Sequence, residues 1–349
     1  MESENIKILI IKSDKIGDFI NFSPCLKILK DNIKKSHITL ICSEYSYPIV
    51  KNYEYIDKLI VFRDKFMIIN LLKNFKNLLT IKYNYLFQFD GKNSSYLIAY
   101  FVRAKIKSAI CYIKKKNIFG IKYFTYRPNK FLLRSFKNHT FCPEDYSEFS
   151  HYQSNYIKLL KNLNFTISTK KNLFSLDKFF EPIFKKFYDD EISSNYILFH
   201  FDERWDKYSN LDRDNVKKII EIISLKKNII ITLGVKNFSF SNELNNIYTN
   251  YSFINNKITL DKKKKKDKVF LLNNIPINLL AYFIKNSEKN VSSHSGTIVH
   301  MSPAFNKEFV DIIKRSKNKE YDRWIPLISN YKRINFDEIN EKYLENFEI

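Results

Sequence analysis

The start of the chain reads as a strand, a polar connection and a helix in immediate succession. Residues 6–11, IKILII, form a short run of branched apolar residues, which is typical of a central strand in a parallel sheet. We predict a tight turn at Gly17 and Asp18, with a helix over 18–31 beginning at once. Ligands of open α/β sheets bind beyond the carboxyl ends of the strands. This segment therefore delivers the Asp18 carboxylate to the place where such proteins do chemistry.

Strands and helices continue to alternate along the first half. The pattern predicts strands over 37–42, 58–62, 85–91 and 107–113, with helices near 46–52, 66–80 and 94–103. Residues 114–145 are rich in Lys, Phe and Tyr and show weak periodicity, and an amphipathic helix follows over 147–163. Such alternation indicates a doubly wound parallel sheet.

A second alternation begins near residue 194. It predicts strands over 195–200, 228–234, 289–292 and 308–312, with helices over 212–225, 276–287 and 297–305. A chain of 349 residues is long enough for two domains. We therefore expect an α/β protein with two Rossmann-like, doubly wound domains facing a central cleft: an N-terminal domain over 1–165, a linker over 166–190 and a C-terminal domain over 191–349.

The chain is strongly basic, with a net charge of +22 from 59 Lys and Arg against 37 Asp and Glu. Such a charge invites a nucleic-acid interpretation. However, Lys, Ile, Phe and Tyr are abundant throughout while Gly and Pro are scarce, which is the bias of an A/T-rich genome, so no nucleic-acid partner is expected. The densest basic run, 261–268, is either a solvated loop or a contact with anionic lipid headgroups.

The cysteines and the N-terminus indicate a cytoplasmic protein. The four cysteines lie far apart, with neither a CxxC pair nor zinc spacing, and Cys25 and Cys42 fall in apolar patterns that predict buried thiols. Residues 1–5 are acidic and lead directly into a strand, so no signal peptide is expected. No apolar run approaches the ~20 residues that span a bilayer, so any contact with the inner membrane would be peripheral.

Glycine is rare, and four of the five glycines follow a predicted strand. Gly17, Gly91 and Gly234 are assigned structural turns, and Gly296 follows the strand over 289–292. Each could simply make a turn, but a chain this poor in glycine keeps it where a side chain would strain the backbone or block a ligand.

Two carboxylates of the first half lie at predicted strand ends. Asp18 could act as the general base for an alcohol nucleophile, or it could cap the helix that follows. Asp90 follows the strand over 85–91, and there the role of a turn former is favoured.

Two polar segments of the second half suit a phosphate ligand. Arg204 and Lys207 follow the strand that ends at His200, and together they supply a bidentate fork and a point charge for a diphosphate. The alternative is a surface cluster of ion pairs with the acidic residues of the same loop.

The second segment is His294-Ser295-Gly296-Thr297, whose small residues before a helix could donate backbone N–H groups to phosphate. It lacks the spacing of a P-loop, and its histidine has no partners with metal-ligand spacing, so no metal site is predicted. The chain has neither the GxGxxG dinucleotide fingerprint nor the GxSxG nucleophile elbow.

These segments resemble glycosyltransferase family 9, the heptosyltransferase-like enzymes of bacterial lipopolysaccharide core assembly. The resemblance covers most of the chain, and the segments that carry it are 8–24, 57–62, 87–91, 151–156, 200–207, 232–234, 279–296 and 323–326. It implies a GT-B fold, with an acceptor-binding N-terminal domain over 1–165 and a nucleotide-sugar-binding C-terminal domain over 191–349. It also implies an inverting, metal-independent transfer of a heptose or related sugar. The donor would be a nucleotide-diphosphate sugar, with no further cofactor. The acceptor would be a lipopolysaccharide or lipooligosaccharide core, or another surface glycan or glycolipid.

By this resemblance Asp18 would be the general base that deprotonates the acceptor hydroxyl. Arg204 and Lys207 would hold the donor diphosphate, and Ser295 and Gly296 would form the donor-phosphate turn. The family usually has Asp-Ser-Gly at this turn where the present chain has His294-Ser-Gly, and this difference leaves the donor open. It also motivates the alternative of a degenerate GT-B protein that binds a nucleotide sugar or glycan without turnover.

Overall fold

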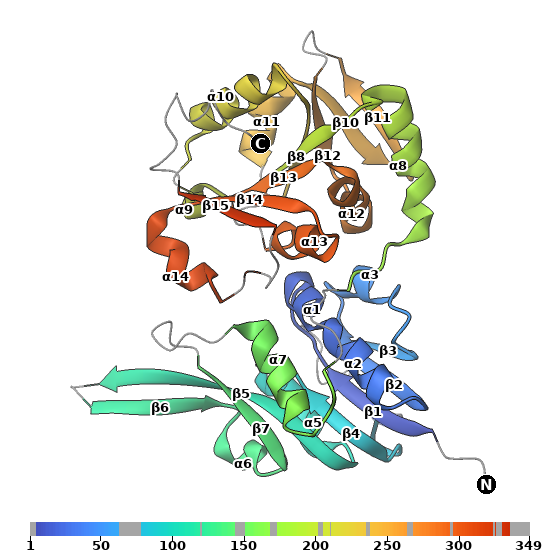
Figure 1. The fold of residues 1–349 in the computed structure, drawn as a ribbon, viewed down its shortest axis with the longest axis vertical. Helices are drawn as coiled ribbons and strands as arrows, with labels where there is room; N and C mark the ends of the chain where they lie inside the picture. The colour runs from blue at the N-terminus through green and yellow to red at the C-terminus, as the bar shows by residue number, and fades with distance from the viewer. Residues whose placement is uncertain are drawn as a thin grey trace. The chain divides into compact units, whose positions relative to one another are not determined.

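The computed structural model of the chain divides into two compact units, each built around one β-sheet with packed helices (Figure 1). Unit 1 comprises Met1–Ser175 and Asp322–Trp324, and unit 2 comprises Leu176–Tyr321 and Ile325–Ile349. The residues that the structure describes are 5–62, 78–118, 121–143, 151–167, 173–201, 205–209, 211–234, 238–263, 268–293, 296–323, 325 and 330–335.

The sheet of unit 1 has the strand order β3-β2-β1-β4-β5-β6, and β7 pairs with β5. Its pairings are parallel except the antiparallel pair β5–β6. The strands are β1 (Ile6–Ile11), β2 (Ser36–Ser43), β3 (Lys58–Phe62), β4 (Tyr83–Gln88), β5 (Ala104–Ile118), β6 (Ile121–Arg127) and β7 (Asn138–Pro143). The chain runs outward from β1 to β3 and then returns to β4, so the strand order reverses between β1 and β4.

Short helices connect these strands. They are α1 (Ile16–Phe22), α2 (Pro24–Asn32), α3 (Tyr47–Val50), α5 (Asn93–Phe101), α6 (Lys130–Leu133) and α7 (Tyr152–Lys161). The helix predicted over 66–80 falls mostly on residues 63–77, which lie outside the described residues.

The first helix differs from the prediction in its start and its continuity. It begins at Ile16, so Gly17 and Asp18 lie in its first turn and not in a turn before it. The predicted single helix is divided at Ser23, because Pro24 has no N–H to donate to the Ile20 carbonyl. That carbonyl accepts instead from the Ser23 N–H at 3.2 Å and the Ser23 hydroxyl at 2.8 Å.

Residues 114–145, whose sequence shows weak periodicity, contain regular structure in their described part. β5 continues to Ile118 and returns as β6 in a ladder from Tyr112 opposite Arg127 to Ile118 opposite Ile121. The run of three lysines at 114–116 conceals the alternation of this strand. Its pairing with β6 and β7 decides the conformation there, because strand formation depends on context more than on local propensity.

The sheet of unit 2 has the order β11-β10-β12-β9-β8-β13-β14-β15, in which only the β10–β11 pair is antiparallel. The strands are β8 (Tyr196–Phe201), β9 (Asn228–Leu233), β10 (Thr249–Ile254), β11 (Lys257–Lys262), β12 (Val269–Asn273), β13 (Lys289–Ser292), β14 (Glu308–Ile313) and β15 (Tyr331–Asn335). The strand order reverses between β8 and β13.

The helical segments of unit 2 are η2 (Lys178–Phe180), α8 (Glu181–Phe187), η3 (Tyr188–Ile192), α9 (Trp205–Ser209), α10 (Arg213–Ser224), α11 (Phe238–Ile247), α12 (Ile277–Asn286), α13 (Ile298–Ala304), η4 (Arg315–Lys317) and α14 (Asn318–Tyr321). The sequence pattern did not predict α11, β10, β11, β12 or β15. Among these, β10 and β11 form a hairpin whose connecting Asn255 and Asn256 have φ of 50° and 59°, a conformation that asparagine tolerates.

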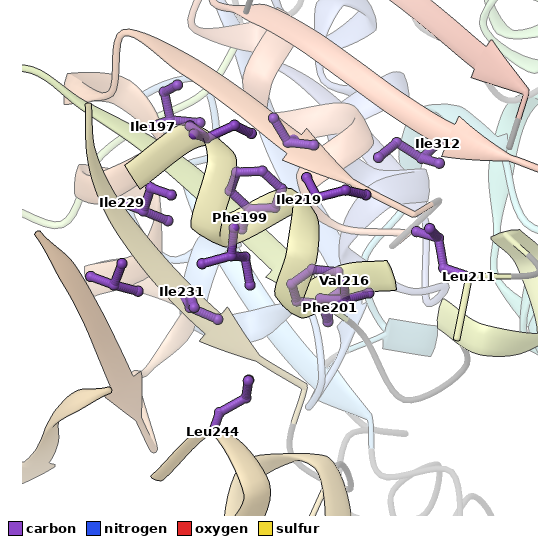
Figure 2. Close-up of a cluster of buried hydrophobic side chains, with 14 of the residues drawn as sticks. Ile197, Phe199, Phe201, Leu211, Val216, Ile219, Ile229, Ile231, Leu244 and Ile312 are labelled. Carbon is purple, nitrogen blue, oxygen red and sulfur yellow. The ribbon is translucent and has the colours of Figure 1, made fainter. Parts of the chain in front are cut away.

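Helix α10 is positioned by its amphipathic pattern. Val216, Ile219, Ile220 and Ile223 recur at helical spacing and are all buried. At its start the Asp212 carboxylate accepts the N–H of residue 215 at 2.7 Å, which caps the helix. The buried face joins strand residues in one hydrophobic core, in which Figure 2 labels Ile197, Phe199, Phe201, Leu211, Val216, Ile219, Ile229, Ile231, Leu244 and Ile312.

Two further sequence predictions concern thiols and membrane crossing. Cys25 and Cys42 are unpaired and buried, which confirms the prediction of buried thiols. Within the described part of the chain, no helix has the length and apolar character needed to cross a membrane.

Candidate functional site

In unit 1, the loops after β1 and β4 meet where the strand order reverses, which is the usual ligand position in doubly wound sheets. The loop after β1 is Lys12–Lys15, and the loop after β4 is Phe89–Lys92. The Lys92 ammonium donates to the Ser13 carbonyl at 2.7 Å, and the Ser13 N–H donates to an Asp90 carboxylate oxygen at 2.9 Å. Two segments far apart in sequence therefore form one polar cluster.

Asp90 is fully buried and organises this cluster. Its carboxylate accepts hydrogen bonds from both the N–H and the hydroxyl of Ser13, from the N–H of Lys92, and from the side chains of Gln88 and Ser95, at 2.8–3.0 Å. Burial raises the pKa of Asp90, and the nearby Asp14 charge raises it further, while the donors from Ser13 and Lys92 lower it. The bond to Lys92 spans two residues, so Asp90 forms its own turn and also holds the loop after β1.

Lys12 is a buried ammonium in the same cluster, with an exposed fraction of 1%. Its Nζ lies 2.6 Å from Asp14 Oδ2, and it donates to the Phe89 carbonyl at 3.2 Å and to the Tyr156 hydroxyl on α7 at 2.9 Å. Burial disfavours its charge, but the Asp14 carboxylate, with Tyr156 and Asp18, holds the pKa of Lys12 well above its ordinary value. Lys12 therefore places a positive charge inside unit 1 at neutral pH.

Asp18 lies in the first turn of α1, where a negative charge is favourable. The N-cap residue is Lys15, so Asp18 is not the N-cap. The Asp18 carboxylate instead accepts a hydrogen bond from the backbone N–H of Lys15, three residues earlier in the chain. Burial raises the pKa of Asp18 to about 6, with Lys12 lowering it and Asp14 raising it. Asp18 is half-buried, so it combines a proton affinity suited to a base near neutral pH with access to solvent.

In unit 2, the corresponding position lies at the ends of β8, β9 and β13. His200 is opposite Thr232 in one neighbouring strand and Ser292 in the other. The His200 Nδ1 lies 2.8 Å from the Thr232 hydroxyl, and burial lowers the pKa of His200 to about 4, so the ring is neutral at pH 7. Next to Ser292, the Ser293 hydroxyl is buried and has no hydrogen-bond partner among the described residues.

The predicted donor-binding residues are placed only in part. Lys207 lies on α9, which is anchored by the packing of Trp205 on Phe201 and Phe240. The side chain of Lys207 is outside the described part of the chain, and so are the whole residues Arg204, His294 and Ser295. The other two residues, Gly296 and Thr297, directly precede α13. Gly296 is exposed, with open space where a Cβ would lie.

The other predicted turn glycines follow strands β4 and β9. A Cβ on Gly91 would come within 3.0 Å of the Tyr112 ring, so a side chain there would require that ring to move. The Gly234 N–H donates to the Phe201 carbonyl at 2.7 Å and so links the ends of β9 and β8.

Sequence reasoning missed Lys12, Asp14 and Tyr156 as site residues. The available signal was the Lys-Ser-Asp-Lys loop at 12–15, which directly follows the buried strand over 6–11. Two residues of this loop, Lys12 and Asp14, act on the charge of Asp18. A lysine that follows a strand is ordinarily exposed to solvent, so the burial of Lys12 could not be predicted from the sequence. Among the described residues, no group of three or more His, Cys, Asp or Glu side chains could hold a metal ion.

Neither the sequence models of known families nor the sequences of curated proteins match the chain. Solved structures do. A glycosyltransferase family 9 protein from Veillonella parvula matches with a TM-score of 0.73 at 15% identity, over 100% of this chain and 92% of that one. The ADP-heptose lipopolysaccharide heptosyltransferase II of E. coli matches with a TM-score of 0.67 at 14% identity, over 98% of this chain and 97% of that one.

A UDP-GlcNAc 2-epimerase from Methanocaldococcus jannaschii matches more weakly, with a TM-score of 0.56 at 13% identity, over 99% of this chain and 92% of that one. The two matches to glycosyltransferases cover nearly the whole of each chain and therefore extend over both sheets of this one. The chain therefore has the heptosyltransferase-like, GT-B-like fold of glycosyltransferase family 9.

Proposed function

We propose that the protein is a glycosyltransferase that moves a sugar, a heptose or a related one, from a nucleotide-diphosphate sugar to a hydroxyl of a surface glycan or glycolipid such as a lipopolysaccharide core. The observation that carries this proposal is the position of Asp18. This carboxylate has a raised pKa, lies beside a buried ammonium, and stands at the strand-order reversal of unit 1 in a chain with the family 9 fold.

In the proposed reaction, Asp18 takes the proton from the acceptor hydroxyl as that oxygen attacks the anomeric carbon of the donor. The bond between the anomeric carbon and the diphosphate oxygen breaks on the opposite face, so the configuration of the sugar inverts. The diphosphate leaves with the bonding electron pair. A base with a pKa of about 6 is ionised at neutral pH and still accepts a proton readily.

The donor would bind at the strand-order reversal of unit 2. The unpartnered Ser293 hydroxyl, the neutral His200 and the polar turn at 294–297 suit the phosphates and the ribose of a nucleotide. Arg204 and Lys207 would neutralise the leaving diphosphate, so the proposal assigns to these two cations the charge stabilisation that a metal ion supplies in other enzymes. The E. coli neighbour is an ADP-heptose enzyme, but the His-Ser-Gly turn here leaves the donor to experiment.

The first test is a thermal-shift panel of the purified chain with ADP, UDP, GDP, CDP and their sugars at fixed salt. A ligand that binds only the native state raises the midpoint of unfolding by mass action. We expect one nucleotide to raise it, and the Lys207→Ala variant to lose that shift. Lys226→Ala is the matched control, because Lys226 is an exposed lysine of unit 2 outside the predicted site.

A transfer assay with the nucleotide sugar so identified separates the alternatives. A transferase consumes donor only when an acceptor is present, whereas an epimerase alters the free nucleotide sugar without one. Binding without any consumption would favour the degenerate binding protein. A panel in which no nucleotide shifts the midpoint would contradict the proposed donor site.

A further inference from the structure

One region of unit 1 has a charge composition unlike the rest of the chain. Residues 91–143 contain twelve Lys or Arg and no Asp or Glu, while all 37 acidic residues lie elsewhere. A compositional bias that enriches lysine does not remove acidic residues from a single segment. This segment therefore accounts for more than half of the net charge of +22, and neither the proposed reaction nor the composition of the chain explains it.

Within this segment, α5, α6 and the starts of β5 and β7 expose aromatic and basic side chains together. Phe101 and Phe131 are 50% and 58% exposed, and both rings pack on Tyr100 with centroids 5.4 and 5.3 Å away. We call the set the basic–aromatic patch; it comprises Tyr100, Phe101, Arg103, Lys105, Phe131, Arg134 and Lys137.

Hydrogen bonds to backbone carbonyls hold these elements side by side. The Lys107 ammonium donates to the carbonyls of Ala99 and Tyr100 at 2.8 and 2.9 Å, which joins β5 to the end of α5. The Lys137 N–H donates to the Lys107 carbonyl at 3.1 Å, which brings the start of β7 to the same place. Among the described residues, the four basic side chains of the patch, at 103, 105, 134 and 137, have no carboxylate partner.

The patch lies at the opposite edge of the sheet from the candidate site. Strands β4 and β5 are parallel, and Tyr83 at the start of β4 is opposite Ala104 at the start of β5, next to the patch. Asp90 follows the other end of β4. The six residues of this strand separate the two edges by about 20 Å, so a partner on the patch leaves Asp18 and its loop uncovered.

We propose that the basic–aromatic patch docks unit 1 on the surface of an anionic lipid bilayer. Phenylalanine rings have no hydrogen-bonding group, so rings left half exposed gain by entering the boundary between headgroups and acyl chains. The guanidinium and ammonium groups around them pair with lipid phosphates, and segment 91–143 contributes no acidic side chain that would repel those phosphates. This inference stands on the surface of unit 1 alone and does not depend on the proposed transfer reaction.

The test is sedimentation of the full chain with vesicles of phosphatidylcholine alone or mixed with phosphatidylglycerol, at low and high salt. A charge variant removes four cations of the patch: Arg103→Gln, Lys105→Gln, Arg134→Gln and Lys137→Gln. An aromatic variant is Phe101→Ser with Phe131→Ser. We expect binding only to anionic vesicles, weakened at least ~100-fold by the charge variant, since each cation contributes roughly fivefold, and about tenfold by the aromatic variant.

Matched controls carry equal changes on exposed residues of unit 2. They are the charge control Lys226→Gln, Lys257→Gln, Lys262→Gln and Lys263→Gln, and the apolar control Ile254→Ser with Leu260→Ser. Both controls should bind anionic vesicles within about threefold of the wild type, since they leave the patch intact. Far-UV circular dichroism and the unfolding midpoint establish that each variant is folded.

Three results would overturn the proposal. The first is wild-type binding that does not distinguish anionic from neutral vesicles. The second is equal loss of binding in the patch and control variants, which would mean that net charge alone is responsible. The third is a charge variant that keeps vesicle binding but loses affinity for a single-stranded oligonucleotide, which would make the patch a nucleic-acid surface.

Discussion

Lys12 and Asp14 form an ion pair, with Nζ and Oδ2 2.6 Å apart, at the end of the first strand of unit 1. The Lys12 side chain is inaccessible to solvent, while 19% of the Asp14 side chain is exposed. Both charges act on the pKa of Asp18, Lys12 lowering it and Asp14 raising it. The proton affinity of the proposed base therefore depends on this pair as well as on its own burial.

The Lys12→Met variant should be strongly destabilised. It removes a buried cation and leaves the Asp14 carboxylate without its partner, and the Phe89 carbonyl and Tyr156 hydroxyl lose a donor. Breaking one side of a buried pair costs about 3–5 kcal/mol in the free energy of unfolding. The measurement is urea unfolding at neutral pH. Lys27→Met is the control, because Lys27 pairs with Asp31 at the surface, and its loss should change stability little.

The rate of transfer should depend on the ionisation of Asp18. We expect it to rise with pH through a midpoint near 6 and then reach a plateau, because only the carboxylate form accepts the acceptor proton. Lys12 lowers the pKa of Asp18, and folded Lys12→Met protein should therefore show the midpoint at higher pH. A pH–rate profile of both proteins measures this. A profile flat between pH 5 and pH 8 would contradict the role of Asp18 as the base.

Asp18→Asn should raise stability at neutral pH. The pKa of Asp18 is about 6 in the folded state and near 3.9 in the unfolded state. The free energy of unfolding therefore falls as pH rises from about 4 to 6, because ionisation of Asp18 is less favourable in the folded protein. The neutral amide avoids this cost, and we expect a gain on the order of 1–3 kcal/mol at pH 7.5 that disappears below pH 4. Thermal unfolding across this range measures it, and equal midpoints at pH 7.5 would count against a raised pKa.

Asp90→Ala should unfold or severely destabilise unit 1. Four residues donate to this buried carboxylate, and alanine leaves their N–H and hydroxyl groups without an acceptor. Each unsatisfied buried group costs about 1–3 kcal/mol, so the total loss should exceed about 3 kcal/mol. Asp57→Ala is the control: Asp57 accepts the Ile38 N–H but is 33% exposed, so water can replace it. Similar losses in the two variants would mean that burial of Asp90 matters little.

The sequence predicted the sheets better than the site. Strands such as 6–11 and 228–233 are apolar on both faces, and this pattern has few interpretations besides a central parallel strand. The predicted strand over 107–113 is shorter than β5 in the structure. The lysine run hides the alternation of this strand, and its pairing with β6 is a tertiary effect. Similarly, burial of Lys12 depends on a carbonyl at 89 and a hydroxyl at 156, contacts too distant in the chain to be read locally.

The most direct test of the central claim compares donor binding and sugar transfer in the wild type and in Asp18→Asn. Calorimetry with the nucleotide sugar found in the thermal-shift panel gives the affinity, and mass spectrometry of a glycolipid acceptor gives the transfer rate. We predict that Asp18→Asn binds the donor like the wild type but transfers its sugar about 10²–10⁴-fold more slowly. Transfer by Asp18→Asn at a rate close to that of the wild type would contradict the account.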